Sequence, residues 1–324
     1  MGPFDRLTSI SPLRKQTMDT RLITPARLAS SVVAVPPLAR DANGKISAAE
    51  NQKLIQYLEQ GGVTTLLYGG NAVLYHIRMK EYAKLMSMLS DLAADQTLIV
   101  PSVGPAYGTM MDQVKILRDF DFPTVMVLPQ REIADEAGLA TGIRRFAEKY
   151  GKPIVLYIKH DRWLPPATVN SMVDDGLISW IKYAVVRDNP SQDDYLREIL
   201  EIVPGEIIVS GIGEQPAIIH MRDFGVVGYT SGCVCVAPAL SMEMLRAIQA
   251  KDYERAESVR KQFCGLEDLR NGIQPIRVLH HAVSAAGIAT TGPMQPMLGE
   301  LSSDDAARVA VAALELKKIG NATS

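Results

Sequence analysis

The sequence has few of the residues that would form disulfides, bind zinc, cross a membrane or attract nucleic acid. Its 324 residues include only three cysteines, Cys233, Cys235 and Cys264, which are too few for a disulfide framework. The C-x-C pair also lacks the second Cys/His pair that a zinc site needs. There is no run of about 18 apolar residues. The 34 Lys and Arg residues nearly balance 36 Asp and Glu residues, so there is no basic excess for nucleic acid.

The composition is instead that of a folded globular protein. Hydrophobic residues make up 47% and charged residues 22% of the chain, which is enough for one large single-core α/β domain. The N-terminal segment 1–22 has scattered charges and no apolar core of the kind found in a secretory signal. Together with reduced thiols, this predicts a cytoplasmic protein.

Eight short apolar runs recur along the first two thirds of the chain and predict strands. They are nearly continuous in hydrophobicity, as expected for parallel strands that are buried on both faces. Helical spacing fills the segments between them, for example in 47–60, 78–94, 108–120 and 135–150. The predicted strands are 32–38, 63–70, 97–104, 122–129, 153–159, 177–184, 206–213 and 226–233. This alternation predicts an α/β fold, a (β/α)8 TIM barrel, in preference to an open doubly wound sheet.

The chain then becomes helical, with predicted helices over 241–263, 269–286 and 303–318. Because a barrel needs only about 250 residues, we interpret the remainder as a C-terminal helical extension. The predicted organisation is therefore a partly loose lead-in over 1–28, a barrel with the catalytic site over 29–240, and the extension over 241–324.

The active site of such a barrel gathers at the carboxyl ends of its strands, which directs attention to Lys182. This lysine lies in the apolar run 178–183, where a charged amine is disfavoured. Burial lowers an amine's pKa, and a neutral amine can attack a ketone to form a Schiff base. A lysine that pairs with a carboxylate is an equally good interpretation of the pattern alone. Tyr157, on the preceding predicted strand, is a candidate proton relay, although a core tyrosine would look the same.

Several motifs resemble the dihydrodipicolinate synthase / N-acetylneuraminate lyase family of class I aldolases and dehydratases. The family's tyrosine motif is matched by PIVLY at 153–157, and its lysine motif by ISWIKY at 178–183. Its glycine-rich motif on the eighth strand is similar to GVVGYTSG at 225–232. The resemblance implies a Schiff-base role for Lys182, a proton-relay role for Tyr157, a 2-oxo acid substrate and a homo-oligomer, dimer or tetramer.

The sequence departs from the family where the substrate carboxylate normally binds. The family's loop after the second strand carries paired hydroxyl residues, whereas this chain has Gly70, Asn71 and Ala72. Asn71 still offers an amide donor. The tyrosine that the synthases carry after the fourth strand is also missing. We therefore expect a substrate different from that of dihydrodipicolinate synthase proper.

Four further residues are candidate substrate contacts. The resemblance makes Arg162, five residues after Tyr157, a candidate for an anionic substrate end. His160 in the same loop, Glu214 after the seventh strand and Ser231 near the end of the eighth are weaker candidates. A solvated arginine, an exposed histidine and a solvated carboxylate are the alternatives for the first three.

The predicted function is a Schiff-base lyase, either aldolase or dehydratase, that acts on pyruvate or a 2-oxo (3-deoxy sugar) acid. It needs no cofactor and no metal, since the lysine itself supplies the electron sink. The altered loop leaves one alternative open, a barrel that binds or senses a 2-oxo acid without catalysis. A phosphate-binding barrel explains the glycines after the seventh and eighth strands less well.

Overall fold

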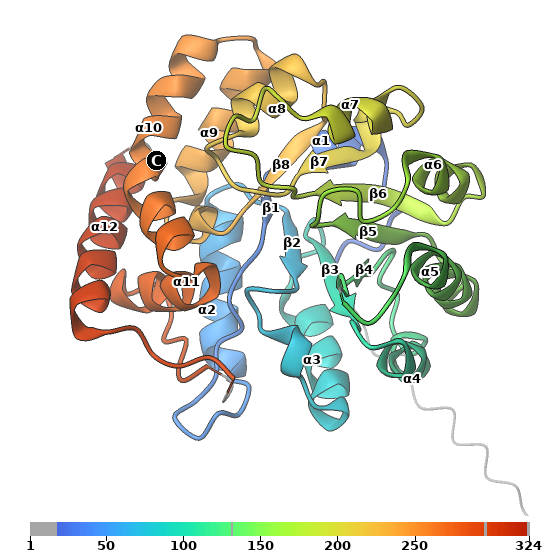
Figure 1. The fold of residues 1–324 in the computed structure, drawn as a ribbon. Coiled ribbons are helices and arrows are strands. Elements are labelled where there is room, and N and C mark those ends of the chain that lie inside the picture. Colours follow the sequence, from blue (N-terminus) through green and yellow to red (C-terminus); the bar gives the residue numbers. More distant parts are fainter. Residues whose placement is uncertain (1–17, 131, 295–296, 323–324) are drawn as a thin grey trace, which may run out of the picture.

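The computed structural model describes residues 18–130, 132–294 and 297–322. Eight parallel strands form a closed barrel in sequence order (Figure 1). They are β1 Val33–Ala34, β2 Thr65–Tyr68, β3 Leu98–Val103, β4 Met126–Val127, β5 Ile154–Ile158, β6 Ile178–Tyr183, β7 Ile208–Ser210 and β8 Gly228–Ser231. Val33 lies opposite both Thr65 of β2 and Thr230 of β8, which closes the barrel. The predicted (β/α)8 fold is confirmed.

Each strand is shorter than the apolar run that predicted it, because only the middle of each run pairs with its neighbours. Every residue of β2 and β3 is buried, as the continuous hydrophobicity of these runs indicated. The ends of the runs form the connecting loops. Cys233, the last residue of the predicted strand 226–233, lies with Cys235 in the 3-10 turn η3 Cys233–Cys235, and both are buried.

Helices surround the strands (Figure 1). The outer helices are α2 Ala48–Gln60, α3 Met79–Leu92, α4 Tyr107–Leu117, α5 Glu136–Tyr150, α6 Pro166–Asp174, α7 Asp194–Leu200 and α8 Ala217–Asp223, with the turns η1 Leu74–His76 and η2 Gly205–Ile207 between them. Ser47 and Asp135 cap α2 and α5 by accepting a hydrogen bond from a backbone N–H three residues on. Gly151, with φ 79°, ends α5 in the left-handed conformation.

The described residues of the C-terminal part form four helices, so the three predicted ones were wrong in their bounds. They are α9 Pro238–Gln249, α10 Tyr253–Gly272, α11 Pro275–Ala285 and α12 Ser303–Ala322. The predicted helix 241–263 is broken at Lys251, where φ is 60°. Asp252 then caps α10, and Gln274 caps α11 with Pro275 in its first turn.

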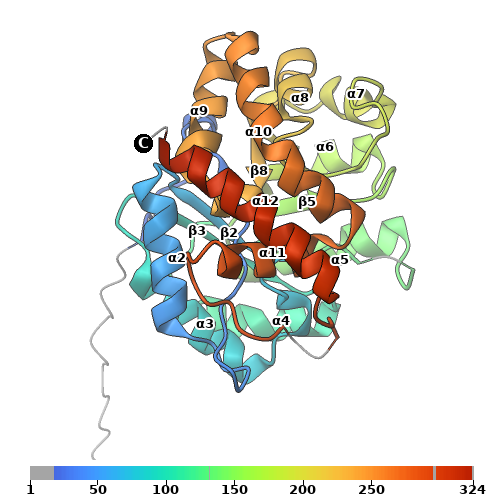
Figure 2. The same cartoon turned by 90° about the vertical axis from the view of Figure 1, so that its left-hand side faces the viewer.

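The first of these helices, α9, contacts both α2 and α8. It therefore completes the ring of barrel helices, and the predicted boundary at residue 240 falls inside it. The other three, α10, α11 and α12, pack against one another on one side of the barrel (Figures 1 and 2). Helix α10 also contacts α8 and η3, which brings its C-terminal end toward the carboxyl ends of β7 and β8.

The described part of the lead-in is held against the barrel, while residues 1–17 lie outside the described residues. The short helix α1, Pro25–Ala29, carries Arg27, whose guanidinium donates hydrogen bonds to the backbone carbonyl of Thr64 and to the side chain of Asp19. The backbone N–H of Asp19 donates to the carbonyl of Thr97 at 3.0 Å. These contacts tie the segment to the starts of β2 and β3. Among the helices of the described ranges, none is long and apolar enough to cross a membrane.

Candidate active site

A small cavity of about 60 Å³ lies at the carboxyl ends of the strands. Its lining joins four of the predicted site residues, which come from three separate strand ends. The lining residues are Val35, Gly70, Asn71, Tyr157, Lys182, Gly211, Gly213, Thr230, Gly232 and Arg270. The lining thus contains one amine, one phenol, one amide and one guanidinium, together with four glycines that allow backbone to approach a small ligand.

Lys182 is positioned by β6, with Trp180 and Ile181 buried before it in the strand. The lysine is only 5% exposed, and its Nζ lies 4.5 Å from the centroid of the Tyr157 ring. Burial, helped by the positive charges of Arg270 and Lys159, lowers the pKa of the Lys182 amine from 10.5 to about 7. A large fraction of this amine is therefore a neutral nucleophile near neutral pH.

Tyr157 lies directly beside Lys182, because the Cα atoms of the two residues are partners in the β5–β6 ladder. Its ring faces the amine, in the geometry of a cation–π contact. Burial raises the pKa of the phenol, with a smaller contribution from Tyr75. The phenol therefore keeps its proton and can donate it to an oxygen in the cavity.

The loop after β2 turns sharply through Val73, which adopts a left-handed conformation with φ 55°. The side-chain amide of Asn71 donates to the carbonyl of Val35 at 2.8 Å, so one of its two N–H groups is occupied. The backbone carbonyl oxygen of Asn71 lies 2.8 Å from Nε2 of His280. Ala72 is 1% exposed and does not line the cavity. At the position where the family carries a hydroxyl residue, this chain therefore places the methyl group of Ala72 in the core.

Glu214 is fully buried, so the alternative of a solvated carboxylate is wrong. Ser231 and Ser241 each donate a hydroxyl to it at 2.7 Å. A second buried carboxyl, Glu267 of α10, accepts hydrogen bonds from the backbone N–H of Glu214 at 3.1 Å and of Gln215 at 2.9 Å. Burial raises the pKa of both carboxyl groups, and repulsion by Glu214 raises that of Glu267 further. Burial therefore disfavours negative charge on both carboxyl groups beside the cavity.

Glu214 and Ser231 lie behind the cavity wall and are not among its lining residues. The wall at this point is Gly213, with φ 109°, where an added Cβ would lie 2.0 Å from Oε1 of Glu267. Their predicted role as direct substrate contacts stays a prediction. In this structure they fix the loop after β7 to α10.

Arg162 and His160 occupy the loop after β5 and do not line the cavity either. The guanidinium of Arg162 donates to both carboxylate oxygens of Glu198, at 2.7 and 2.5 Å. Its side chain is 55% exposed, and the guanidinium lies 5.8 Å from the centroid of the Tyr195 ring. Without rearrangement, Arg162 contacts Glu198 rather than a ligand of the cavity, and its assignment as a substrate contact stays a prediction.

The most important lining residue that the sequence analysis missed is Arg270. It lies on α10, three residues after Glu267, so the two side chains share one face of the helix. The spacing E-x-x-R at 267–270 was visible, but α10 was interpreted as an extension outside the barrel. No sequence pattern placed the end of this helix over β7 and β8.

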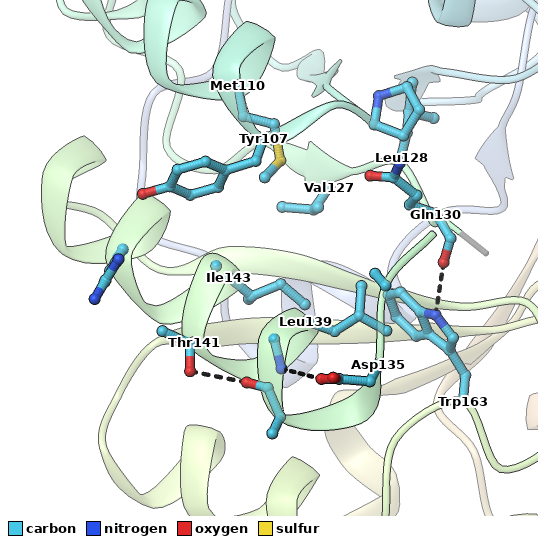
Figure 3. Close-up of a pocket in the computed structure, with 16 residues that line it drawn as sticks. Tyr107, Met110, Val127, Leu128, Gln130, Asp135, Leu139, Thr141, Ile143 and Trp163 are labelled. Carbon is cyan, nitrogen blue, oxygen red and sulfur yellow. Dashed lines mark hydrogen bonds between the residues drawn. The ribbon is translucent and has the colours of Figure 1, made fainter. Parts of the chain in front are cut away.

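A larger cavity of about 570 Å³ lies outside the barrel, between α4 and α5. Figure 3 shows Tyr107 and Met110 of α4 on one side and Leu139 and Ile143 of α5 on the other. Trp163 closes one end, where its Nε1 donates to the carbonyl of Gln130 at 2.9 Å. This cavity contains neither Lys182 nor Tyr157. Within the described ranges, no group of three His, Cys, Asp or Glu side chains could hold a metal ion.

Comparisons with known proteins agree with this architecture. The sequence model of the dihydrodipicolinate synthetase family matches residues 29–315. A 4-hydroxy-tetrahydrodipicolinate synthase of Methanosarcina barkeri is 24% identical, over 88% of this chain and 96% of its own. A probable 5-dehydro-4-deoxyglucarate dehydratase of Xanthobacter autotrophicus is 21% identical, over 86% and 93%.

Among solved structures, the 4-hydroxy-tetrahydrodipicolinate synthase of Methylacidiphilum fumariolicum SolV superposes with a TM-score of 0.79 at 15% identity, covering 91% of this chain and 98% of that one. That similarity establishes the fold. The family match covers nearly the whole barrel and most of the C-terminal helices, and the chain therefore belongs to the dihydrodipicolinate synthetase family.

Proposed function

We propose that this protein is a lyase that forms a Schiff base between Lys182 and a 2-oxo acid. The observation that carries the proposal is the buried Lys182 amine, which lines a closed-in cavity at the strand ends and lies 4.5 Å from the Tyr157 ring. Relatives at 24% and 21% identity are named as a 4-hydroxy-tetrahydrodipicolinate synthase and a probable 5-dehydro-4-deoxyglucarate dehydratase, which supports the proposal of a lyase.

In this mechanism the neutral Nζ of Lys182 attacks the ketone carbon of the 2-oxo acid. The carbonyl oxygen takes a proton, for which Tyr157 is the nearest phenol, and the carbinolamine then loses water to give an iminium. The iminium withdraws electrons from the adjacent carbon, so that a C–C or C–O bond next to it can break. The cavity volume of about 60 Å³ favours a substrate whose reacting end is as small as pyruvate.

Reduction with borohydride tests this proposal directly, because it converts the iminium into a stable secondary amine. We expect one reduced pyruvate per wild-type chain, located on the peptide that contains Lys182. The adduct should be lost in Lys182→Ala and retained in Lys261→Ala, a matched control that removes an exposed lysine of α10. Absence of any adduct with pyruvate and with longer 2-oxo acids would disprove Schiff-base chemistry.

One observation favours the alternative of a binding or sensor barrel. The Asn71 amide, which stands where the family carries a hydroxyl, is partly occupied by the Val35 carbonyl. A sensor would bind a 2-oxo acid without an adduct and would retain that binding in Lys182→Met. The trapping experiment therefore separates the two candidates.

The family resemblance and the three free cysteines support two further expectations. We propose that the chain assembles as a homo-oligomer, which light scattering on the purified protein would test. We also propose that the protein is cytoplasmic. Its cysteines are free, and Cys233 and Cys235 are buried, as is usual for proteins of a reducing compartment.

A further inference from the structure

Among the described residues that line the small cavity, Arg270 is the only cation besides Lys182. Arg270 is half-buried, and its Nε is buried without a hydrogen-bond partner among the residues that the structure describes. A buried N–H donor normally has an acceptor, because leaving one unsatisfied costs free energy. The missing acceptor points to a ligand.

The acidic neighbour of Arg270 is already engaged elsewhere. Glu267, one helical turn earlier, accepts from the backbone N–H groups of Glu214 and Gln215. Burial and the Glu214 charge raise the pKa of Glu267, and the charge of Arg270 lowers it by a smaller amount, so Arg270 and Glu267 interact electrostatically without a hydrogen bond between them. Arg270 also lines the cavity, where its charge helps to keep Lys182 neutral.

A second donor meets Arg270 in one corner of the cavity, above Gly232. A Cβ added to Gly232 would lie 3.1 Å from Nδ2 of Asn71 and 3.3 Å from Nε of Arg270. Asn71 has one amide N–H left after its bond to Val35. Gly232 has φ −88°, a conformation open to any residue, so its backbone does not require glycine. What the glycine provides here is space between two donors.

We propose that Arg270, with Asn71, binds the carboxylate of the 2-oxo acid in the corner above Gly232. The inference rests on the proposed function, and it identifies the group that fixes the acid end of the substrate. Guanidinium and carboxylate pair by charge-assisted hydrogen bonds. In this chain a residue of α10 therefore takes over the binding that the paired hydroxyls of the β2 loop provide elsewhere in the family.

Calorimetric binding of pyruvate, compared with its uncharged analogue methyl pyruvate, tests this assignment without requiring catalysis. The variants are Arg270→Met, which keeps much of the side-chain volume, and Lys261→Met, which removes a charge from the exposed face of the same helix. We expect pyruvate to bind about 10- to 100-fold more weakly to Arg270→Met and unchanged to Lys261→Met. Methyl pyruvate should bind equally to wild type and Lys261→Met, and Arg270→Met should weaken it much less than it weakens pyruvate, because only the neutral fraction of Lys182 then changes.

A second variant, Gly232→Ala, fills the corner without changing any charge. It should weaken pyruvate binding while circular dichroism remains that of the wild type. The added Cβ would also lie 3.2 Å from Cδ2 of Leu279, so a small fall in the melting temperature is expected. Equal pyruvate binding by wild type and Arg270→Met would overturn the assignment, as would wild-type protein that does not bind pyruvate. Binding that depends on Arg270 but yields no borohydride adduct would instead refute the Schiff-base proposal and leave the role of Arg270 standing.

Discussion

Replacing Lys182 by Met should make the protein more stable, by an amount that depends strongly on pH. Met has nearly the same length but no amine to bury. The pKa of the Lys182 amine falls from 10.5 to about 7 in the folded protein, mainly because burial disfavours its charged form. One pKa unit corresponds to about 1.4 kcal/mol. The buried amine therefore costs about 5 kcal/mol at a pH where both the folded and the unfolded state are protonated.

The direction in which stability changes with pH follows from the number of protons that the folded and the unfolded states bind. Between pH 10.5 and about 7 the unfolded chain binds a proton at Lys182 and the folded chain does not, so the stability of the wild type falls as the pH is lowered through this window. Below pH 7 the full cost is present. The gain from Lys182→Met should be about 5 kcal/mol at pH 6, roughly half of that at pH 8.5, and near zero above pH 10.5.

Chemical denaturation of both proteins between pH 6 and 10 measures this difference in the free energy of unfolding. Lys261→Met, which removes an exposed lysine of α10, is the control and should show no such trend. A gain of stability that does not change with pH would mean that Lys182 is not held neutral by burial. A loss of stability at pH 6 would mean that the amine has an ionic partner, and either result would refute the reasoning.

Three other predictions concern neighbouring features. Tyr157→Phe should lower turnover about 10²- to 10⁴-fold while borohydride trapping persists, and full turnover would exclude a proton-relay role for the phenol. Gly213→Ala places a Cβ 2.0 Å from Oε1 of Glu267 at a φ of 109° and should cost about 3 kcal/mol or more in thermal or urea unfolding, whereas Gly265→Ala, whose Cβ would meet nothing within 4 Å, should stabilise α10 by about 0.5 to 1 kcal/mol. Burial lowers the pKa of His280 from 6.5 to about 4, so the free energy of unfolding of the wild type should fall by up to about 3 kcal/mol between these pH values. In His280→Gln the free energy of unfolding should fall less over the same range, and an equal fall in both proteins would contradict the prediction.

The barrel was predictable because its signal is local. Each buried parallel strand is a short apolar run bounded by turn residues, and eight such runs alternate with amphipathic segments. Lys182 stood out for the same reason, as a charge inside an apolar run, and the β5–β6 pairing could be expected from chain order alone. Strand lengths were overestimated, since apolar runs continue into buried loops that do not pair.

The C-terminal helices were predicted with wrong bounds because their breaks depend on single residues. Lys251 adopts a positive φ although nothing in its residue type requires it. Asp252 and Gln274 are caps that a periodicity count passes over. Only the tertiary structure brings the end of α10 over β7 and β8, so the role of Arg270 could not be derived from spacing along the chain.

The candidate site therefore combines features of two kinds. The apolar strand that buries Lys182 can be identified in the sequence, and it accounts for most of the lowered pKa. The second contribution comes from Arg270, whose charge reaches the same cavity only through the packing of α10. If Arg270 binds the carboxylate as proposed, one cation acts at two ends of a 2-oxo acid, since it also favours the neutral form of the Lys182 amine. Once the carboxylate binds, it neutralises Arg270 and weakens this second effect, so a bound 2-oxo acid should raise the pKa of Lys182 above its value in the free protein.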